Sequence, residues 1–424
     1  MANDGPDPRP RRWRWALAGL ALAAAGWFAW PHALAAWSLR QARRAIDERR
    51  FDQAYDRLAA CLRAWPNDPE TRLLASRAAR QSGRAAEARE HLDAVPDDAE
   101  HRAARVLERA LLEASEGQLP KVESFLRRQL EAEPDQAPAI LDVLSWQGMR
   151  AHRLLDARAD LDRWRELRPG DAEPLVRRGW VAERLLDNDG AARDYRAALE
   201  LDPSRDQVRQ RLGEVLLGRD SAEALKQFEA LARHKPDDPE VLLGMARARL
   251  NLAELDAADE LLDRLLRASP DHAGAMAERG RLELARRHPE EAERWLRKAL
   301  ARSPHDRETT HRLLRALQAQ GKAAEVAQVR EGLDRLDADL ARMNKLMPQV
   351  NERPNDPALR TEIGKIFLRN GLESDGVRWL NTALEYAPTF AEAHEALAGH
   401  FESRGNKGQA ARHRKALARA KAGG

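Results

Sequence analysis

Two histidines near the end of the chain have the residue type of a catalytic metal site but not its spacing. The segment HEALAGH begins at His394 and ends at His400. A zinc-protease helix places its two histidines four residues apart, so that both side chains lie on one face. A separation of six residues turns the second side chain about 240° around the helix, so the two cannot share an ion. We therefore predict no metal site in this segment.

No other motif in the sequence predicts catalysis. The chain contains no CxxCH haem-attachment motif, no glycine-rich phosphate loop and no nucleophile elbow. Its one cysteine, Cys61, can form neither an internal disulfide nor a thiolate metal cluster, and it occupies a small-residue position that favours a structural role. We expect a protein that is not an enzyme and that needs no cofactor.

The composition favours helix and gives no indication of nucleic-acid binding. A third of the 424 residues are charged, and acidic and basic side chains nearly cancel, at a net charge of +3. Alanine, leucine, arginine and glutamate, which are all strong helix formers, dominate the sequence. Arginine greatly outnumbers lysine, with 62 arginines and 10 lysines, as is typical of proteins from a GC-rich bacterial genome.

The N-terminal segment, residues 15–36, is apolar enough to cross a membrane. The stretch from Trp15 to Leu34 has 20 residues, which at about 1.5 Å per residue span the roughly 30 Å hydrocarbon core of a bilayer. Tryptophans flank it at both ends, as they do at membrane interfaces. We predict a transmembrane helix that follows a basic segment, residues 1–14. A cleaved signal peptide is the alternative, because PHALA before Ala36 has the form of a signal-peptidase site.

The side of the membrane on which the chain lies depends on basic residues at both ends of this segment. They are Arg9, Arg11, Arg12 and Arg14 before it, and Arg40, Arg43 and Arg44 after it. A short basic head stays in the cytoplasm, whereas a long domain crosses regardless of its charge. We therefore expect a single-pass protein of the bacterial inner membrane with its bulk outside the cytoplasm. A cytoplasmic bulk and a secreted product of signal cleavage are the alternatives.

Prolines recur along the chain at a nearly constant interval. Steps of 33 to 35 residues separate Pro134, Pro169, Pro203, Pro236, Pro270 and Pro304. Before some of these prolines, such as Pro203, a large residue lies between two small ones, here Ala191, Tyr195 and Ala198. Residues at i, i+4 and i+7 share one helix face, and the small ones allow a neighbouring helix to approach closely. A period near 34 that ends in proline indicates a solenoid.

This pattern resembles the tetratricopeptide repeat (TPR) family over residues 37–419. The resemblance implies an all-α fold, in which helix-turn-helix units stack into a right-handed α-solenoid that here follows the transmembrane helix. We expect these parts: a TPR array of about eight or nine units at 37–321, irregular at 69–136; an extended helix at 322–350; a C-terminal TPR pair at 351–419; and a tail at 420–424.

The extended helix carries an apolar seam with heptad spacing. Its members, Val326, Val329, Leu333, Leu336, Leu340, Met343 and Met347, alternate in steps of three and four residues. In one interpretation, the first half packs as an ordinary second helix and the rest folds back on the next unit. In the other, the helix projects and pairs through Leu333, Leu336, Leu340, Met343 and Met347 with a partner or with a second copy, as a homo-oligomer.

The resemblance also implies which side chains face a ligand, because the ninth and thirteenth positions of each first helix in the family point into a concave groove. The ninth positions are Trp146, Trp180, Glu214, Arg247, Arg281, Arg315 and Lys365, and the thirteenth positions include Arg150, Arg184, Asn251 and Arg369. The groove would thus be aromatic and basic at its N-terminal end, and basic further on. Tryptophan is a large anchor, and the planar guanidinium group suits carboxylates.

Some members of the family hold the terminal carboxylate of a peptide with such residues. By resemblance, we predict a protein or peptide partner with an acidic or C-terminal segment, bound by Arg247, Asn251, Arg281 and Arg315. The alternative is that these side chains are ordinary solvated helix surface.

Two functions fit these features. The first is a membrane-anchored scaffold that binds a protein partner in the bacterial cell envelope through its concave groove. The second is a regulatory subunit of a membrane-associated biosynthetic enzyme, with the repeats facing the cytoplasm and the transmembrane helix itself contacting the enzyme.

Overall fold

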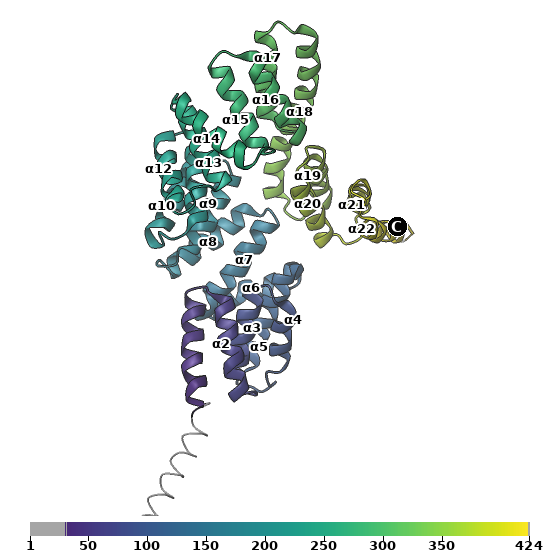
Figure 1. The fold of residues 1–424 in the computed structure, drawn as a ribbon. Helices are drawn as coiled ribbons and strands as arrows, with labels where there is room; N and C mark the ends of the chain where they lie inside the picture. The colour runs from purple at the N-terminus through teal and green to yellow at the C-terminus, as the bar shows by residue number, and fades with distance from the viewer. Residues whose placement is uncertain (1–29, 31, 423–424) are drawn as a thin grey trace, which may run out of the picture. The chain divides into compact units, whose positions relative to one another are not determined.

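The fold is all-helical over the part of the chain that the structure describes. The computed structural model describes residues 30 and 32–422, and these residues contain no strand (Figure 1). They fall into two compact units, Met1–Pro134 and Asp135–Gly424, called here unit one and unit two. Residues 15–29 and 31 of the predicted transmembrane segment lie outside the described part. Within that part, no helix combines the length and the apolar character that crossing a membrane requires.

In the described part of unit one, a helical stretch covers residues 32–47. The unit continues through α2 (Phe51–Ala64), α3 (Pro69–Gln81), α4 (Ala85–Asp93), α5 (Arg102–Glu113) and α6 (Leu119–Ala132). Helix α4 has only nine residues, and a π turn at Ala114–Gln118 joins α5 to α6. Both features lie in the region where the proline spacing departs from 34 residues.

Unit two consists of consecutive helix pairs. The pairs are α7 (Ala137–Arg150) with α8 (Leu154–Leu167), α9 (Glu173–Arg184) with α10 (Asn188–Leu201), α11 (Asp206–Leu216) with α12 (Ser221–Ala232), α13 (Pro239–Asn251) with α14 (Leu255–Ala268), α15 (Ala273–Ala285) with α16 (Pro289–Arg302), α17 (Arg307–Ala319) with α18 (Ala323–Glu352), α19 (Pro357–Arg369) with α20 (Glu373–Tyr386), and α21 (Ala391–Ser403) with α22 (Lys407–Ala422). This is the stacked helix-turn-helix arrangement that the repeat pattern predicts.

Local sequence determines where several first helices begin. The Asp238 carboxylate accepts a hydrogen bond from the Val241 amide at 3.2 Å, and Pro239 occupies the first helical position. Asp356 and Pro357 repeat this arrangement in α19. An aspartate cap satisfies amides that have no partner inside the helix, and proline lacks the amide that would be unpaired there. The Asp-Pro pairs therefore mark the N-termini of first helices.

The turn inside most pairs contains one residue in the left-handed conformation. This residue is His152, Leu186, Ala253, Arg287, Gly321, Gly371 or Gly405, each with a φ between 55° and 73°. Leucine, alanine and arginine are strained there. Since Leu186 is 84% exposed, these turns require the backbone shape rather than a particular side chain.

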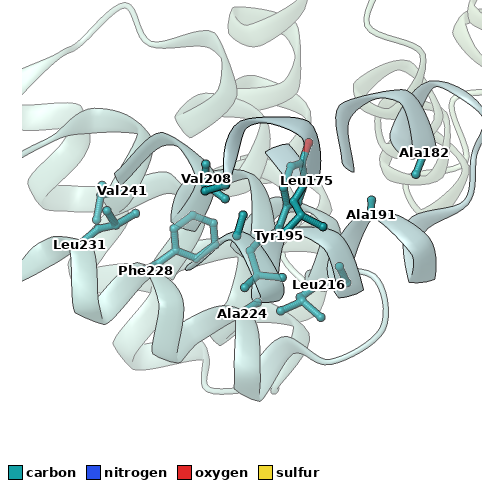
Figure 2. Packing of buried hydrophobic residues seen from close by; sticks show 14 residues of the cluster. Leu175, Ala182, Ala191, Tyr195, Val208, Leu216, Ala224, Phe228, Leu231 and Val241 are labelled. Carbon is teal, nitrogen blue, oxygen red and sulfur yellow. The ribbon is translucent and has the colours of Figure 1, made fainter. Parts of the chain in front are cut away.

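In four pairs of unit two, a glycine of the first helix lies against a large side chain of the second. A β-carbon added to Gly179 would lie 2.5 Å from Cε1 of Tyr195, and one added to Gly280 would lie 2.5 Å from Cγ of Leu296. Tyr195 is buried in the cluster that joins the pairs α9–α10 and α11–α12 (Figure 2). The small and large positions of the sequence pattern are therefore the contact surface of these pairs.

Helix α18 is one continuous 30-residue helix that joins two parts of the core. Its first half packs as the partner of α17, because Val326 and Val329 contact the cluster that contains Leu296. Its last turns pack against α19 and α20, where Met343 and Met347 are half-buried beside Ile363. The second half of this continuous helix thus packs against the next pair.

We predict that Gly280→Ala and Gly332→Ala change stability in opposite directions. Both glycines are helical, so both substitutions gain up to about 1 kcal/mol of helix propensity. The new methyl group at 280 overlaps Leu296, and such overpacking costs about 1–3 kcal/mol. The site at 332 is open, with no atom within 4 Å of the added β-carbon. Urea denaturation followed by circular dichroism should show a loss for Gly280→Ala and a gain for Gly332→Ala; a gain for both would contradict the close-approach argument.

Candidate functional site

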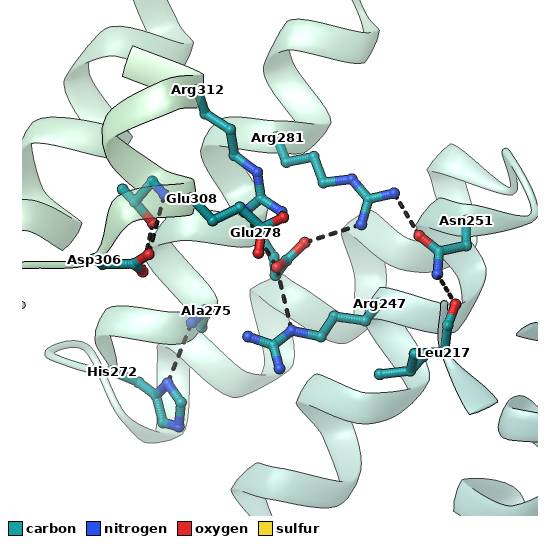
Figure 3. Close-up of polar contacts among 11 residues, drawn as sticks. Leu217, Arg247, Asn251, His272, Ala275, Glu278, Arg281, Asp306, Glu308 and Arg312 are labelled. Atoms are coloured by element: carbon teal, nitrogen blue, oxygen red, sulfur yellow. Dashed lines mark hydrogen bonds and ion pairs between the residues drawn. The ribbon is translucent and has the colours of Figure 1, made fainter. Parts of the chain in front are cut away.

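Three of the four residues predicted to clamp a carboxylate lie together in unit two, around a buried glutamate. Glu278 of α15 accepts a hydrogen bond from Arg247 Nε at 3.2 Å and one from Arg281 at 3.4 Å (Figure 3). Arg312 of α17 donates to the same carboxylate at 3.2 Å. The Glu278 side chain is only 3% exposed. Three guanidinium groups therefore share one buried carboxylate.

Asn251 extends this group toward the preceding pair. Its side-chain oxygen accepts a hydrogen bond from Arg281 at 2.5 Å. Its amide nitrogen donates to the Leu217 carbonyl at 2.7 Å and to the Ser221 hydroxyl at 3.0 Å. All of the polar atoms of this side chain are therefore used within the protein. We call Arg247, Asn251, Glu278, Arg281 and Arg312 the Glu278 cluster.

Arg315, the fourth predicted clamp residue, lies outside this cluster. Its side chain is exposed, and no hydrogen bond or ion pair joins it to the residues that the structure describes. Lys365 of α19 is half-buried and is also without an ion pair to those residues.

The charges in the Glu278 cluster do not cancel. Its three arginines face Glu278 and one further carboxylate, Glu308, which binds Arg312 and is 75% exposed. One positive charge is therefore left over, and the side chains of Arg247 and Arg281 remain 39% and 31% exposed. Since an arginine can donate to more than one acceptor, this surface can bind a carboxylate from outside while Glu278 holds the guanidinium groups in place.

The aromatic positions nearer the start of unit two lie beside arginine. Trp146 is 49% exposed, and the Arg177 guanidinium carbon lies 5.5 Å from its ring centroid. Arg184 lies 4.8 Å from the ring centroid of Trp180. Cation–π contacts of this kind hold a ring in place while leaving part of its surface open. Arg150, also predicted here, donates to Gln147 at 3.4 Å.

A hollow of about 440 Å³ lies beside Trp180. Its walls come from α9, α10 and α11 and include Val176, Tyr195 and Arg211. Tyr195 donates to Glu183, and Arg211 lies 3.5 Å from the same carboxylate. An apolar floor with a charged rim can accept one side chain of a partner.

A second hollow, of about 660 Å³, lies between α17, α18 and α19 and involves one predicted groove residue. Arg369 donates to Asp339 at 2.7 Å, and both line this hollow. The hydrogen bonds from Arg369 and Asn370 lower the pKa of the Asp339 carboxyl group below its usual range.

The seam residues of α18 divide between the core and the surface. Leu333 is buried, Leu336 lines the second hollow, and Leu340 is 45% exposed. Pairing with another chain through the seam stays a prediction. Leu336 and Leu340 are the seam residues whose side chains such a chain could contact.

Sequence reasoning missed the residues that organise the site. Glu278 and Arg312 are the sixth residues of their repeat units, not the ninth, and neither belongs to the family's groove positions. The spacing contained a usable signal, because Glu278 follows Arg247 by 31 residues and precedes Arg312 by 34. A charge of opposite sign one repeat away is the pattern expected of an ion pair between stacked units.

Of the three chemistry-bearing residues singled out in the sequence, His394 and Cys61 are buried. His394 is buried and lies 3.1 Å from His413, between their Nδ1 atoms, and 3.0 Å from the Pro388 carbonyl. Cys61 is fully buried, and burial raises the pKa of its thiol. Over the described residues, no group of three histidine, cysteine, aspartate or glutamate side chains could hold a metal ion.

Comparison with protein-family models identifies repeats in both units. Models described as tetratricopeptide repeat match residues 45–114 and 219–279, and a second such model matches residues 176–239. These stretches are tetratricopeptide repeats. The search of curated proteins gave no match.

The solved structures to which the chain is similar include three proteins of low identity. PilW, described as a widely conserved type IV pilus biogenesis factor, is 22% identical, with 47% of this chain and 92% of that chain covered and a TM-score of 0.41. For pilF of Pseudomonas aeruginosa, the identity is 18%, the match covers 48% of this chain and 92% of that chain, and the TM-score is 0.39. For MamA of Desulfovibrio magneticus RS-1, the identity is 20%, the match covers 40% of this chain and 97% of that chain, and the TM-score is 0.37.

We predict that Glu278→Gln destabilises unit two. Removing the buried negative charge leaves three guanidinium groups without their common partner, which costs about 3 kcal/mol. Glu308→Gln is the control, because this glutamate also binds Arg312 but is exposed, and its loss costs less than about 1 kcal/mol. Hydrogen exchange of the α15 amides, followed by mass spectrometry, should be faster in the first variant than in the second. Equal exchange in both variants would contradict the structural role of Glu278.

Proposed function

We propose that the protein is a membrane-anchored scaffold that binds a protein partner in the bacterial cell envelope through first-helix residues of unit two. The Glu278 cluster is the observation that carries this proposal. It combines guanidinium groups that are fixed by a buried carboxylate with enough exposure for two of them to contact a ligand.

The partner that suits this surface is a peptide segment rich in carboxylates or one that ends in a free C-terminus. One positive charge remains after the internal pairs of the cluster are counted, and Arg315 and Lys365 add two more on following first helices. Fixed arginines lose little conformational entropy when they bind a carboxylate. The Trp180 hollow gives the same segment a place for one apolar side chain.

The membrane anchor in this proposal is supported by the sequence of residues 15–34. Their length, apolar character and flanking tryptophans match what a bilayer requires. An anchor would keep the repeats near the membrane and so raise the effective concentration of a partner there.

We predict that Arg247→Gln with Arg281→Gln weakens the binding of an acidic peptide. The probe is a short fluorescein-labelled peptide of alanine, aspartate and glutamate with a free C-terminus, and binding to the full chain is measured by fluorescence anisotropy. Since both arginines would contact its carboxylates, the dissociation constant should rise about tenfold or more. The salt dependence of binding should also become weaker.

The matched control is Arg233→Gln with Arg267→Gln, which removes the same charge from exposed sites at the end of α12 and on α14. Circular dichroism confirms that both double variants are folded. Equal weakening in the two variants would mean that the probe responds to overall charge, and no binding by the unmodified chain at low salt would contradict an acidic ligand.

We also predict that the C-terminus lies outside the cytoplasm and that the N-terminal segment is retained. Alkaline phosphatase fused after Gly424 should be active, because it folds only outside the cytoplasm, and N-terminal sequencing should find the residues before Trp15 in the mature chain. A fluorescent-protein fusion at the same position is the complementary reporter. A fluorescent signal from this fusion, together with an inactive phosphatase fusion, would place the repeats in the cytoplasm, as in the regulatory-subunit alternative. A mature chain that starts at Ala36 would contradict the anchor.

A further inference from the structure

The turn between α7 and α8 contacts a helix that is remote along the chain. The ring of His152 lies against the indole of Trp379 in α20, with centroids 3.9 Å apart and an angle of 31° between the planes. Helices α7 and α8 form the first pair of unit two, and α19 and α20 form the seventh. This contact therefore joins the two ends of a run of seven stacked pairs.

Trp379 is held in place by its own helix pair. Arg360 of α19 is completely buried, and its guanidinium carbon lies 5.4 Å from the Trp379 centroid and 5.0 Å from that of Tyr386. Arg360 in turn donates to the Pro354 carbonyl at 2.7 Å and to the Thr382 hydroxyl at 3.2 Å. The indole is thus fixed by residues of its own end of the unit, and His152 is the only side chain that the α7–α8 turn places against its ring in the described contacts.

His152 occupies a turn position that does not itself need histidine. The equivalent left-handed residues Leu186, Ala253 and Arg287 are all exposed. His152, by contrast, is 4% exposed. The burial of this side chain is therefore a property of the contact with Trp379 and not of the turn.

The contact leaves two buried polar atoms without partners, which offsets part of the stabilisation from ring packing. Nδ1 of His152 and Nε1 of Trp379 are both buried without a hydrogen-bond partner in the described part of the chain. Buried polar atoms without partners are costly, and opening the contact would let water reach both. Ring packing favours the closed contact, whereas hydration favours the open one.

We propose that His152 and Trp379 form a clasp that closes the seven-pair run of unit two and that opens and closes reversibly.

The charges around His152 make the clasp sensitive to acid. Burial, together with Arg378 of α20, Arg360 of α19 and Arg184 of α9, lowers the pKa of His152 to about 3. Asp375 pairs with Arg378, and Glu385, whose own pKa is raised by burial, lies near Arg360 and near Arg150 of α7. An exposed histidine has a pKa near 6.5. His152 in the open form binds a proton more tightly than in the closed form. The closed form is therefore most populated above about pH 6.5, and its population decreases as the pH falls toward 3.

The experiment compares His152→Asn with Leu186→Asn in the full chain. Asparagine tolerates the left-handed conformation, so both substitutions suit the turn, but only the first removes a clasp residue. Spin labels are placed on cysteines at the exposed positions Ala159 in α8 and Asn381 in α20. Cys61 is replaced by alanine, which stands at the equivalent position as Ala198 and Ala299 in other pairs. The label-to-label distance is measured by pulsed electron resonance.

We expect a longer and broader distance distribution for His152→Asn and an unchanged one for Leu186→Asn. In the labelled chain with His152, the long-distance population should grow about tenfold per pH unit between pH 6 and 5, and His152→Asn should lose this dependence. Identical distributions in both variants would overturn the clasp.

Discussion

The close approach of two helices within each pair is the constraint on which the rest of the structure depends. Gly179 and Gly280 lie so near Tyr195 and Leu296 that even a methyl group would overlap. One pair packed in this way still has an apolar face, which only another pair can cover. The chain therefore repeats the same unit, and the repeats leave one set of first-helix side chains available for a ligand. An extended binding surface, rather than a single deep pocket, is what such stacking produces.

Ion pairs between successive units give the many arginines a physical role. Arg196 of α10 binds Glu223 of α12, and Arg205, just before α11, binds Glu173 of α9. The guanidinium group can hold two acceptors in one plane, which lysine cannot do. In the Glu278 cluster this same chemistry reaches a partly exposed surface. Stability and ligand binding thus use the same side chains, so a ligand carboxylate would share arginines that Glu278 already positions.

Much of the fold could be predicted from the sequence, because the period of 34 and the small-large pattern act within one or two units. The grouping of Arg247, Asn251 and Arg281 followed from their positions in successive first helices. Glu278 could not be singled out, since it is one of 69 acidic residues and its burial depends on packing between units. The contact of His152 with Trp379 is harder still to predict, because it depends on small rotations that accumulate over seven pairs.

The central claim is that first helices of unit two form the ligand-binding surface, and hydrogen–deuterium exchange of the full chain with and without the acidic probe peptide tests it most directly. If the claim is right, saturating peptide slows exchange in α13, α15 and α17, whose residues make up the Glu278 cluster, and leaves α14 and α16 unchanged. Slower exchange confined to α14 and α16, or equal in both sets of helices, would contradict it.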